Sequence, residues 1–218
     1  MKFDLHIHSS YSDDSYISPE DIIKTAEQRG LDGIALNDHN TLEGYRSVKE
    51  YDTDLIIAPA LEVSTSGGHV MALGVQEEIE DRLSIPETKD RIEERGGLAI
   101  ALHPYRTPSG LGEKNVRANE WAAIEGLNGR CSKRNNKRAQ DLAASLGLPS
   151  VAGSDAHRLK SVGKAFTVLE DVDDWGDILS QIKNGETDFG GESRTYWDHI
   201  FYIKRTLSRW IKRGFTRI

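Results

Sequence analysis

The chain of 218 residues contains a single cysteine, Cys131, so no disulfide can form within it. It also lacks a long hydrophobic run, and nothing approaches the roughly 18 apolar residues of a membrane span. Residues 3–8 already have the pattern of a strand, which leaves no room for a signal peptide ahead of them. With 37% hydrophobic and 29% charged residues, the composition predicts a cytoplasmic protein of one globular domain, with a small appendage at most.

The formal net charge of -7 argues against broad, electrostatically driven binding of nucleic acid, so no stable nucleic-acid complex is expected. The charge is uneven, because residues 194–218 carry +6 and the preceding residues carry -13. Apolar residues recur at three- and four-residue steps over 196–213, which predicts a basic amphipathic helix. Such a helix can lie on an anionic membrane. Docking on its own acidic domain is favoured here, since cations late in a helix also complement its dipole.

Short apolar runs alternate along the chain with segments of helical periodicity. The runs 34–36, 55–58 and 98–102 are continuously apolar, which is typical of strands buried on both faces of a parallel sheet. The predicted strands are 2–7, 33–37, 55–62, 69–75, 98–103, 122–127, 150–154 and 166–169, and the predicted helices are 19–29, 41–51, 86–96, 132–146, 174–184 and 196–213. These repeated units predict an α/β fold with a parallel sheet or barrel. Two long loops, 104–120 and 185–195, are expected to line a site.

Histidines and acids follow the ends of several predicted strands. His6 and His8 are two residues apart, so both side chains point to the same face of the first strand. Further strand ends run into residues 37–39, Glu62, His103 and residues 155–157. A lone histidine after a strand is more often a hydrogen-bonded structural residue. In a parallel barrel, however, all these ends meet at one face, and such a mixed imidazole and carboxylate cluster suits Zn, Mn or Fe.

Three other polar residues are ambiguous from position alone. Asp13 lies in the loop after His8, where an acid is commonly a turn or N-cap residue. His69 opens a predicted strand after two glycines, and a hairpin histidine is its plain structural interpretation. His199 lies among the apolar residues of the tail and is interpreted as structural.

In their order and spacing, the motifs resemble those of the PHP superfamily, named after polymerase and histidinol phosphatase. They are Asp4-Leu5-His6-Ile7-His8-Ser9, Ser12-Asp13, Asn37-Asp38-His39, Glu62, His103-Pro104 and Gly153-Ser154-Asp155-Ala156-His157. The resemblance implies a distorted (β/α)7 barrel over residues 1–184, with a metal site at the C-terminal ends of the strands. Residues 185–218 would form a PHP-associated C-terminal segment that includes the basic helix.

The resemblance also implies a ligand set for two or three Mn, Fe or Zn ions. The implied metal ligands are His6, His8, Asp13, His39, Glu62, His69, His103, Asp155 and His157. Asp155, His157 and Glu62 would be the catalytic residues, and His69 would either bind metal or contact phosphate. Two positions depart from the family pattern: the usual Thr-Asp-His appears as Asn37-Asp38-His39, and Asp13 stands where some members have His. These departures are expected to alter metal preference without abolishing binding.

The implied activity is hydrolysis of phosphate esters by metal-activated water. Arg106 and Arg130 are the predicted phosphate contacts, because Arg106 directly follows a ligand motif and arginine binds phosphate bidentately. A small nucleotide or sugar phosphate is the favoured substrate, and the alternative is a 5'-3' exonuclease or phosphodiesterase acting on short oligonucleotides. An amidohydrolase-like C–N hydrolase is a further alternative, although no lysine stands at a strand end to form a carbamate bridge. A non-catalytic metal-binding regulator would be expected to lack ligands.

Overall fold

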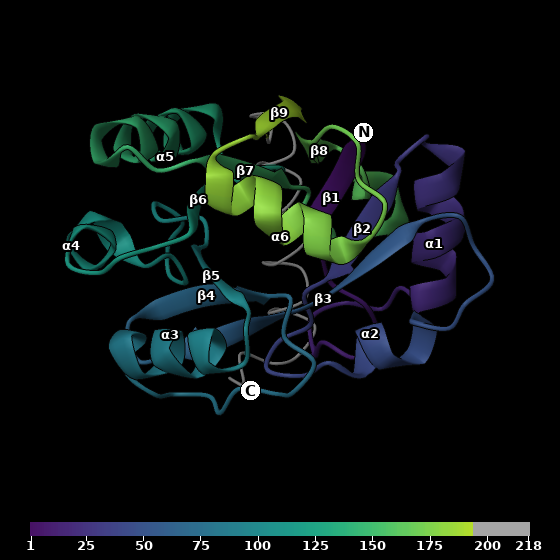
Figure 1. Ribbon diagram of the computed structural model, residues 1–218, viewed down its shortest axis with the longest axis horizontal. Coiled ribbons are helices and arrows are strands. Elements are labelled where there is room, and N and C mark those ends of the chain that lie inside the picture. The colour runs from purple at the N-terminus through teal and green to yellow at the C-terminus, as the bar shows by residue number, and fades with distance from the viewer. Residues whose placement is uncertain (194–218) are drawn as a thin grey trace, which may run out of the picture.

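The computed structural model describes residues 1–193, and the predicted tail helix at 196–213 lies outside the described residues. Its strands are β1 (Lys2–Ile7), β2 (Gly33–Leu36), β3 (Ile56–Thr65), β4 (Gly68–Leu73), β5 (Leu98–Ala101), β6 (Ala123–Asn128), β7 (Ser150–Gly153), β8 (Ala165–Val168) and β9 (Asp188–Gly191). Neighbouring strands pair in chain order, and β8 also pairs with β1, which closes an eight-stranded barrel (Figure 1). The predicted α/β barrel is confirmed.

Two strands of the barrel interrupt the regular β/α alternation. The pairs among β1, β2 and β3 are parallel, as are those among β5, β6 and β7. In contrast, β4 is antiparallel to both its neighbours, and it follows β3 directly through a hairpin that begins after Thr65. β8 is likewise antiparallel to β7 and β1. The six parallel strands therefore point their C-terminal ends to the same side of the barrel, where α/β folds build their sites.

Helices lie around the outside of the barrel in Figure 1. They are α1 (Pro19–Gln28), α2 (Glu43–Val48), α3 (Ile85–Glu94), α4 (Gly112–Arg117), α5 (Lys133–Leu146) and α6 (Trp175–Asn184). Local sequence explains several of their ends. Ser18 accepts a hydrogen bond from the backbone of Asp21 at the start of α1, and Gly147 ends α5 with a left-handed φ of +66°. Among residues 1–193, no helix is both long and apolar enough to cross a membrane.

Two segments predicted as long loops contain short regular elements, so the prediction of uninterrupted loops is wrong there. The segment 104–120 includes α4, and the segment 185–195 includes β9, which pairs with β8. α4 has six residues, too few for helical periodicity to stand out in the sequence. β9 reads Asp-Phe-Gly-Gly, and aspartate and glycine are depleted in strands, so its pairing is set by tertiary context.

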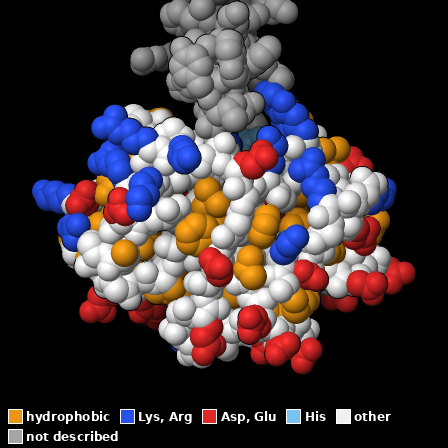
Figure 2. Space-filling model, turned by 90° about the horizontal axis from the view of Figure 1, so that it is seen from above, with side chains coloured by type: hydrophobic (Ala, Val, Ile, Leu, Met, Phe, Trp, Pro, Cys, Tyr) orange, Lys and Arg blue, Asp and Glu red, His pale blue; other side chains and the backbone are white. Residues whose placement is uncertain are grey.

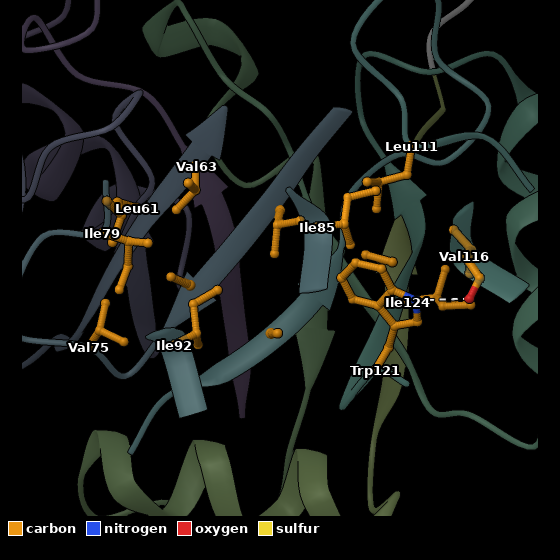
Figure 3. Close-up of a cluster of buried hydrophobic side chains, with 14 of the residues drawn as sticks. Leu61, Val63, Val75, Ile79, Ile85, Ile92, Leu111, Val116, Trp121 and Ile124 are labelled. Atoms are coloured by element: carbon orange, nitrogen blue, oxygen red, sulfur yellow. Dashed lines mark hydrogen bonds between the residues drawn. The ribbon is translucent and has the colours of Figure 1, made fainter. Parts of the chain in front are cut away.

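The largest buried hydrophobic cluster joins α3 and the segment around α4 to the sheet (Figure 3). Ile92 of α3 lies in this cluster with Val75 and is fully buried. At its other end the indole Nε1 of Trp121 donates a hydrogen bond to the carbonyl of Val116 at 3.0 Å. This bond satisfies the polar atom of an otherwise apolar residue. The cluster holds β4 and β5 in place and so supports two predicted ligands, His69 on β4 and His103 after β5.

Replacing Ile92 by alanine is expected to lower the free energy of unfolding by about 2–5 kcal/mol, because a fully buried aliphatic side chain leaves a cavity. Urea denaturation followed by circular dichroism measures the change. Arg91→Ala on the same helix is the control, since that side chain is 57% exposed, and a change within about 0.5 kcal/mol is expected. Equal effects of the two substitutions would contradict the packing described here.

Candidate metal centre

Side chains on or just beyond the C-terminal ends of the parallel strands, together with one from β4, converge on one pocket. The pocket has a volume of about 200 Å³ and is lined by His8, Asp14, His39, Glu62, His69, Arg106, Pro108, Ser109, Arg130, Asp155 and His157. His6 and His103 lie beside it, against Glu62. The structure thus brings together every predicted ligand except Asp13.

Glu62 lies at the centre of the cluster and is buried. Its Oε2 is 3.1 Å from His6 Nε2 and 3.0 Å from His8 Nε2. Its Oε1 is 3.2 Å from His103 Nε2 and also contacts His69 Nδ1. Burial opposes ionisation, but hydrogen bonds from His103 and the other three histidines outweigh it and hold the pKa of Glu62 well below its usual value. An ionised carboxylate with both oxygens inside the cluster could hold metal through either oxygen.

Four overlapping groups of side chains have donor atoms within 4.8 Å of one another. They are His8, Asp14, His39 and His157; His6, Glu62 and His103; His6, His8 and Asp155; and His39, Glu62 and His69. His6, His8, His39 and Glu62 each belong to more than one group. Because the groups share donors, they form one connected cluster that could hold metal.

Asp14, rather than the predicted Asp13, is the loop carboxylate that reaches this cluster. Asp14 Oδ2 is 2.7 Å from His157 Nε2, and Asp14 Oδ1 is 3.6 Å from His39 Nε2. Asp13 is exposed and belongs to none of the donor groups found among the described residues. The assignment therefore moves by one residue. Two adjacent aspartates in a loop carry no periodicity, so the sequence held no signal to distinguish them.

Ser12 and Asp38 position the histidine that follows β1. Ser12 Oγ donates a hydrogen bond to Asp38 Oδ1 at 2.8 Å and lies 3.2 Å from His8 Nδ1. This contact leaves Nε2 of His8 facing Glu62. Burial lowers the pKa of His8 to about 3, so the ring is neutral near pH 7. A neutral imidazole is the form that binds a metal.

Arg106 and Arg130, the predicted phosphate contacts, both engage Asp155. Arg130 Nη1 donates a hydrogen bond to Asp155 Oδ1 at 3.0 Å, and Arg106 Nη1 donates one to Asp155 Oδ2. Burial disfavours the charged form of Asp155, but the two guanidinium groups outweigh it and hold its pKa well below the usual range. Both arginines line the pocket and are partly exposed, so their positive charge faces the space beside the ligands.

Glu125 is a buried carboxylate of the site that the sequence does not single out. This buried carboxylate on β6 contacts His6 through one oxygen and the backbone of His103 through the other. The available signal was an acid within the apolar strand predicted at 122–127, because a buried charge needs specific partners. That signal was not used, since the residue lies inside the strand rather than at its end.

Two of the predicted ligands stand at backbone conformations that disfavour non-glycine residues. His103 has a φ of +26° and Asp155 a φ of +51°, and each stands two residues after the end of a strand, β5 and β7 respectively. Such left-handed conformations cost of order 1–3 kcal/mol each and persist where the surrounding structure enforces them. Both strained residues turn the chain sharply at the pocket and direct their side chains toward it. Strain of this kind is typical of a functional site.

The side chains present fit divalent or trivalent metal ions of the first transition series. The donors are imidazole nitrogens and carboxylate oxygens, a set that suits Mn, Fe or Zn. His39 Nδ1 and His103 Nδ1 are buried without a hydrogen-bond partner, although buried polar atoms are normally satisfied. Both belong to rings of the donor cluster, where metal binding would fix the ring orientation.

Comparison with known proteins agrees with this geometry. Residues 4–94 match the model of the PHP domain, and residues 133–187 match that of the PHP-associated domain. An uncharacterised protein of Methanocaldococcus jannaschii is 39% identical over 119 residues, which is 48% of this chain and 68% of that protein. The chain belongs to the PHP superfamily. The boundary predicted at residue 184 stays a prediction, because most of the segment beyond it lies outside the described residues.

Solved structures share the fold of this PHP protein. A two-domain protein from Bacteroides vulgatus, containing a predicted PHP-like metal-dependent phosphoesterase, aligns with a TM-score of 0.73 at 17% identity. The alignment covers 88% of this chain but 65% of the Bacteroides protein, so the chain spans somewhat less than two thirds of that molecule. An amidohydrolase from Chromobacterium violaceum aligns with a TM-score of 0.66 at 18% identity, over 84% of this chain and 97% of the other. Family membership and the donor cluster together support a metal-dependent hydrolase.

Proposed function

We propose that this PHP protein hydrolyses phosphate esters of small molecules, such as nucleotides or sugar phosphates, with water as the nucleophile. The observation that carries the proposal is the position of Arg106 and Arg130, which line the same pocket as the metal-binding donors. In a C–N hydrolase with a neutral substrate the two guanidinium groups would serve only to pair with Asp155, whereas both also line the open pocket. A phosphoryl group carries negative charge on several oxygens, and arginine binds these bidentately.

The ions implied by the donor set would be held by His6, His8, Asp14, His39, Glu62, His69, His103, Asp155 and His157. When bound, Mn, Fe or Zn ions lower the pKa of a water molecule and neutralise phosphoryl oxygens. The chain itself holds three of these donors in the protonation state that metal binding requires. Glu62 and Asp155 remain ionised because their pKa values are held low, and His8 remains neutral because its pKa is lowered.

The size of the pocket favours entry of a phosphoryl group rather than a whole large ligand. Its volume of about 200 Å³ is below the roughly 300–1,000 Å³ typical of pockets that enclose a drug-sized molecule. The leaving group would therefore remain at the mouth of the pocket, beside Asp14, which is 48% exposed. The protein would thus recognise the phosphate strongly and the rest of the substrate weakly.

The decisive experiment compares hydrolysis of p-nitrophenyl phosphate with that of bis-p-nitrophenyl phosphate by protein loaded with Mn²⁺, Fe²⁺ or Zn²⁺. Faster turnover of the monoester is expected. Faster turnover of the diester would favour the oligonucleotide alternative. Turnover of neither ester, by protein that holds at least one equivalent of metal, would contradict a phosphoesterase.

One observation favours the oligonucleotide alternative. α5 begins two residues after Cys131, close to Arg130, and exposes Lys133, Arg134, Lys137 and Arg138. Figure 2 shows Lys and Arg side chains over one part of a molecular face and Asp and Glu mainly along the opposite edge. A basic surface near the mouth of the pocket could hold the phosphate backbone of a short single-stranded oligonucleotide.

The C–N hydrolase alternative rests on the fold shared with the Chromobacterium amidohydrolase.

Arg106→Ala is expected to lower kcat/KM for p-nitrophenyl phosphate by about 10- to 100-fold, mainly through KM, because a charge-assisted hydrogen bond contributes roughly 1.5–3 kcal/mol. Steady-state kinetics give the change, and elemental analysis should show unchanged metal content. Arg91→Ala, on the exposed face of α3, is the control and should behave as wild type. Loss of metal along with activity would show that Arg106 supports the centre instead of the substrate.

A further inference from the structure

Glu125 is a buried carboxylate in the middle of the barrel wall, with 1% of its surface exposed. It lies on β6, between the strands that carry other parts of the site. The ion pair that it forms in the described part of the chain is with His6. Burying a carboxylate without a lysine or arginine partner costs free energy, so we expect this carboxylate to have a specific role.

The two oxygens of Glu125 serve two different ligands. Oε1 is 2.7 Å from His6 Nδ1, and Oε2 accepts a hydrogen bond from the backbone N–H of His103 at 2.9 Å. The side-chain amide of Asn128 donates to both oxygens at 3.1 Å. His6 is on β1 and His103 follows β5, so one carboxylate on β6 ties together ligands from two other strands.

These contacts fix the tautomer of His6. A carboxylate can only accept hydrogen bonds, so Glu125 requires a proton on Nδ1 of His6, while Glu62 can accept a second proton from Nε2 as long as no metal is bound. Nε2 is 3.1 Å from Glu62 and 3.1 Å from His8 Nε2, and when a metal takes the place of its proton, the remaining proton stays on Nδ1 against Glu125. Metal-binding histidines commonly donate their other ring N–H to a carboxylate, which fixes the ring and raises the basicity of the binding nitrogen.

The same carboxylate holds the backbone of the second ligand. His103 has a φ of +26°, which a non-glycine residue adopts only under constraint. Its N–H is bound by Glu125, and Oε1 of Glu62 lies 3.2 Å from its ring. The hydrogen bond from the backbone thus supports the turn that aims the imidazole of His103 into the pocket.

We propose that Glu125 is a positioning residue of the metal centre, which sets the tautomer of His6 and the backbone of His103 without binding metal itself. The inference rests on the metal centre of the proposed function. Both oxygens of Glu125 are already occupied by donors, and it belongs to none of the donor groups found among the described residues.

Glu125→Gln separates this role from simple space filling. Glutamine has the same shape but offers one acceptor oxygen and one amide N–H₂ group. The amide nitrogen must then face a donor, either the N–H of His103 or the Nδ1–H of His6. In the second case His6 would have to move its proton to Nε2, the atom needed for the metal.

The test is titration of metal-free protein with Co²⁺, followed by the visible spectrum and by competition with a chelator. Wild type should bind, and Glu125→Gln should bind roughly 10- to 100-fold more weakly with an altered spectrum, while circular dichroism stays unchanged. Glu120→Gln, at an exposed position shortly before β6, is the matched control. Wild-type affinity and spectrum in Glu125→Gln would overturn the positioning role. Failure of the wild type to bind Co²⁺ would instead overturn the proposed centre, and this inference with it.

A second measurement tests the tautomer of His6 in the wild-type protein, without any substitution at position 125. The ¹⁵N shifts of the imidazole rings in Zn²⁺-loaded wild type report which nitrogen carries the proton, and His6 is assigned by loss of its signals in His6→Gln. Protonated Nδ1 with metal-bound Nε2 is the expected result. Protonated Nε2 with metal-bound Nδ1 would overturn the proposal, whatever the behaviour of Glu125→Gln.

Discussion

Glu62→Gln is expected to reduce kcat/KM for phosphoester hydrolysis by more than about 10²-fold. Changing a residue that only supports metal ligands costs up to about 10²-fold, and Glu62 is itself a candidate ligand, so its loss should be larger. Glu62 contacts four histidines that lie on or next to three strands, β1, β4 and β5, so its charge is shared by the whole cluster. Glutamine keeps the size of the side chain but removes that charge and one acceptor. The centre should therefore lose affinity for its ions as well as its activity.

The measurement is kcat/KM for p-nitrophenyl phosphate, together with metal content after expression with excess metal. Glu120→Gln, which is exposed, should keep both quantities at the wild-type level. The fold of Glu62→Gln should survive, because the three large hydrophobic clusters of the barrel do not involve the carboxylate. Turnover within a few-fold of wild type would show that Glu62 is not at the reaction centre.

Much of the barrel could be predicted from the sequence because its strands are short, apolar and separated by capped helices. Each of the eight barrel strands overlaps a predicted one, and Gly30 and Gly147, which directly follow the predicted helices 19–29 and 132–146, have positive φ. The antiparallel direction of β4 and β8 was not predicted, because strand direction depends on the length and path of a connection rather than on the strand's own residues. The hairpin before β4 leaves no room for a crossover helix.

The residues of the site also divide into those whose place could be predicted from the sequence and those whose place could not. The convergence of candidate ligands at strand ends, such as His103 and Asp155, was predictable because position along the strand determines which edge of the barrel they reach. Asp14 was not, since its place depends on a loop whose serines bind Asp38. Glu125 was not predictable, because its contacts with His6 and His103 form only when β1, β5 and β6 come together in the barrel. Long-range pairing of this kind leaves no periodic signal in a single chain.

Asp155→Asn should lower activity by at least about 10²-fold, for a reason that differs from that for Glu62. Asp155 Oδ1 is 3.6 Å from His8 Nε2 and 3.0 Å from Arg130 Nη1, so the carboxylate lies between the donor cluster and the phosphate contacts. Asparagine offers one oxygen and an amide N–H₂ group, which repels a guanidinium donor. Metal binding should therefore weaken, and Arg106 and Arg130 should lose the carboxylate that positions them.

This substitution also has an expected signature in the stability of the metal-free protein. The folded-state pKa of Asp155 is depressed by the two arginines, so the ionised group contributes stability at pH values above its unfolded pKa of about 3.9. That contribution is lost as the pH falls through the folded pKa. Asp155→Asn should therefore be less stable than wild type at pH 7, and the difference should shrink as the pH falls below about 4.

Urea denaturation of metal-free wild type and Asp155→Asn at several pH values measures this difference, and kinetics with p-nitrophenyl phosphate measure the loss of activity. Asp173→Asn, at an exposed position before α6, should show neither effect. A stability difference that grew on acidification would contradict the depressed pKa. Full activity in Asp155→Asn would contradict the site itself, because Asp155 is the residue at which the metal-binding donors and both arginines meet.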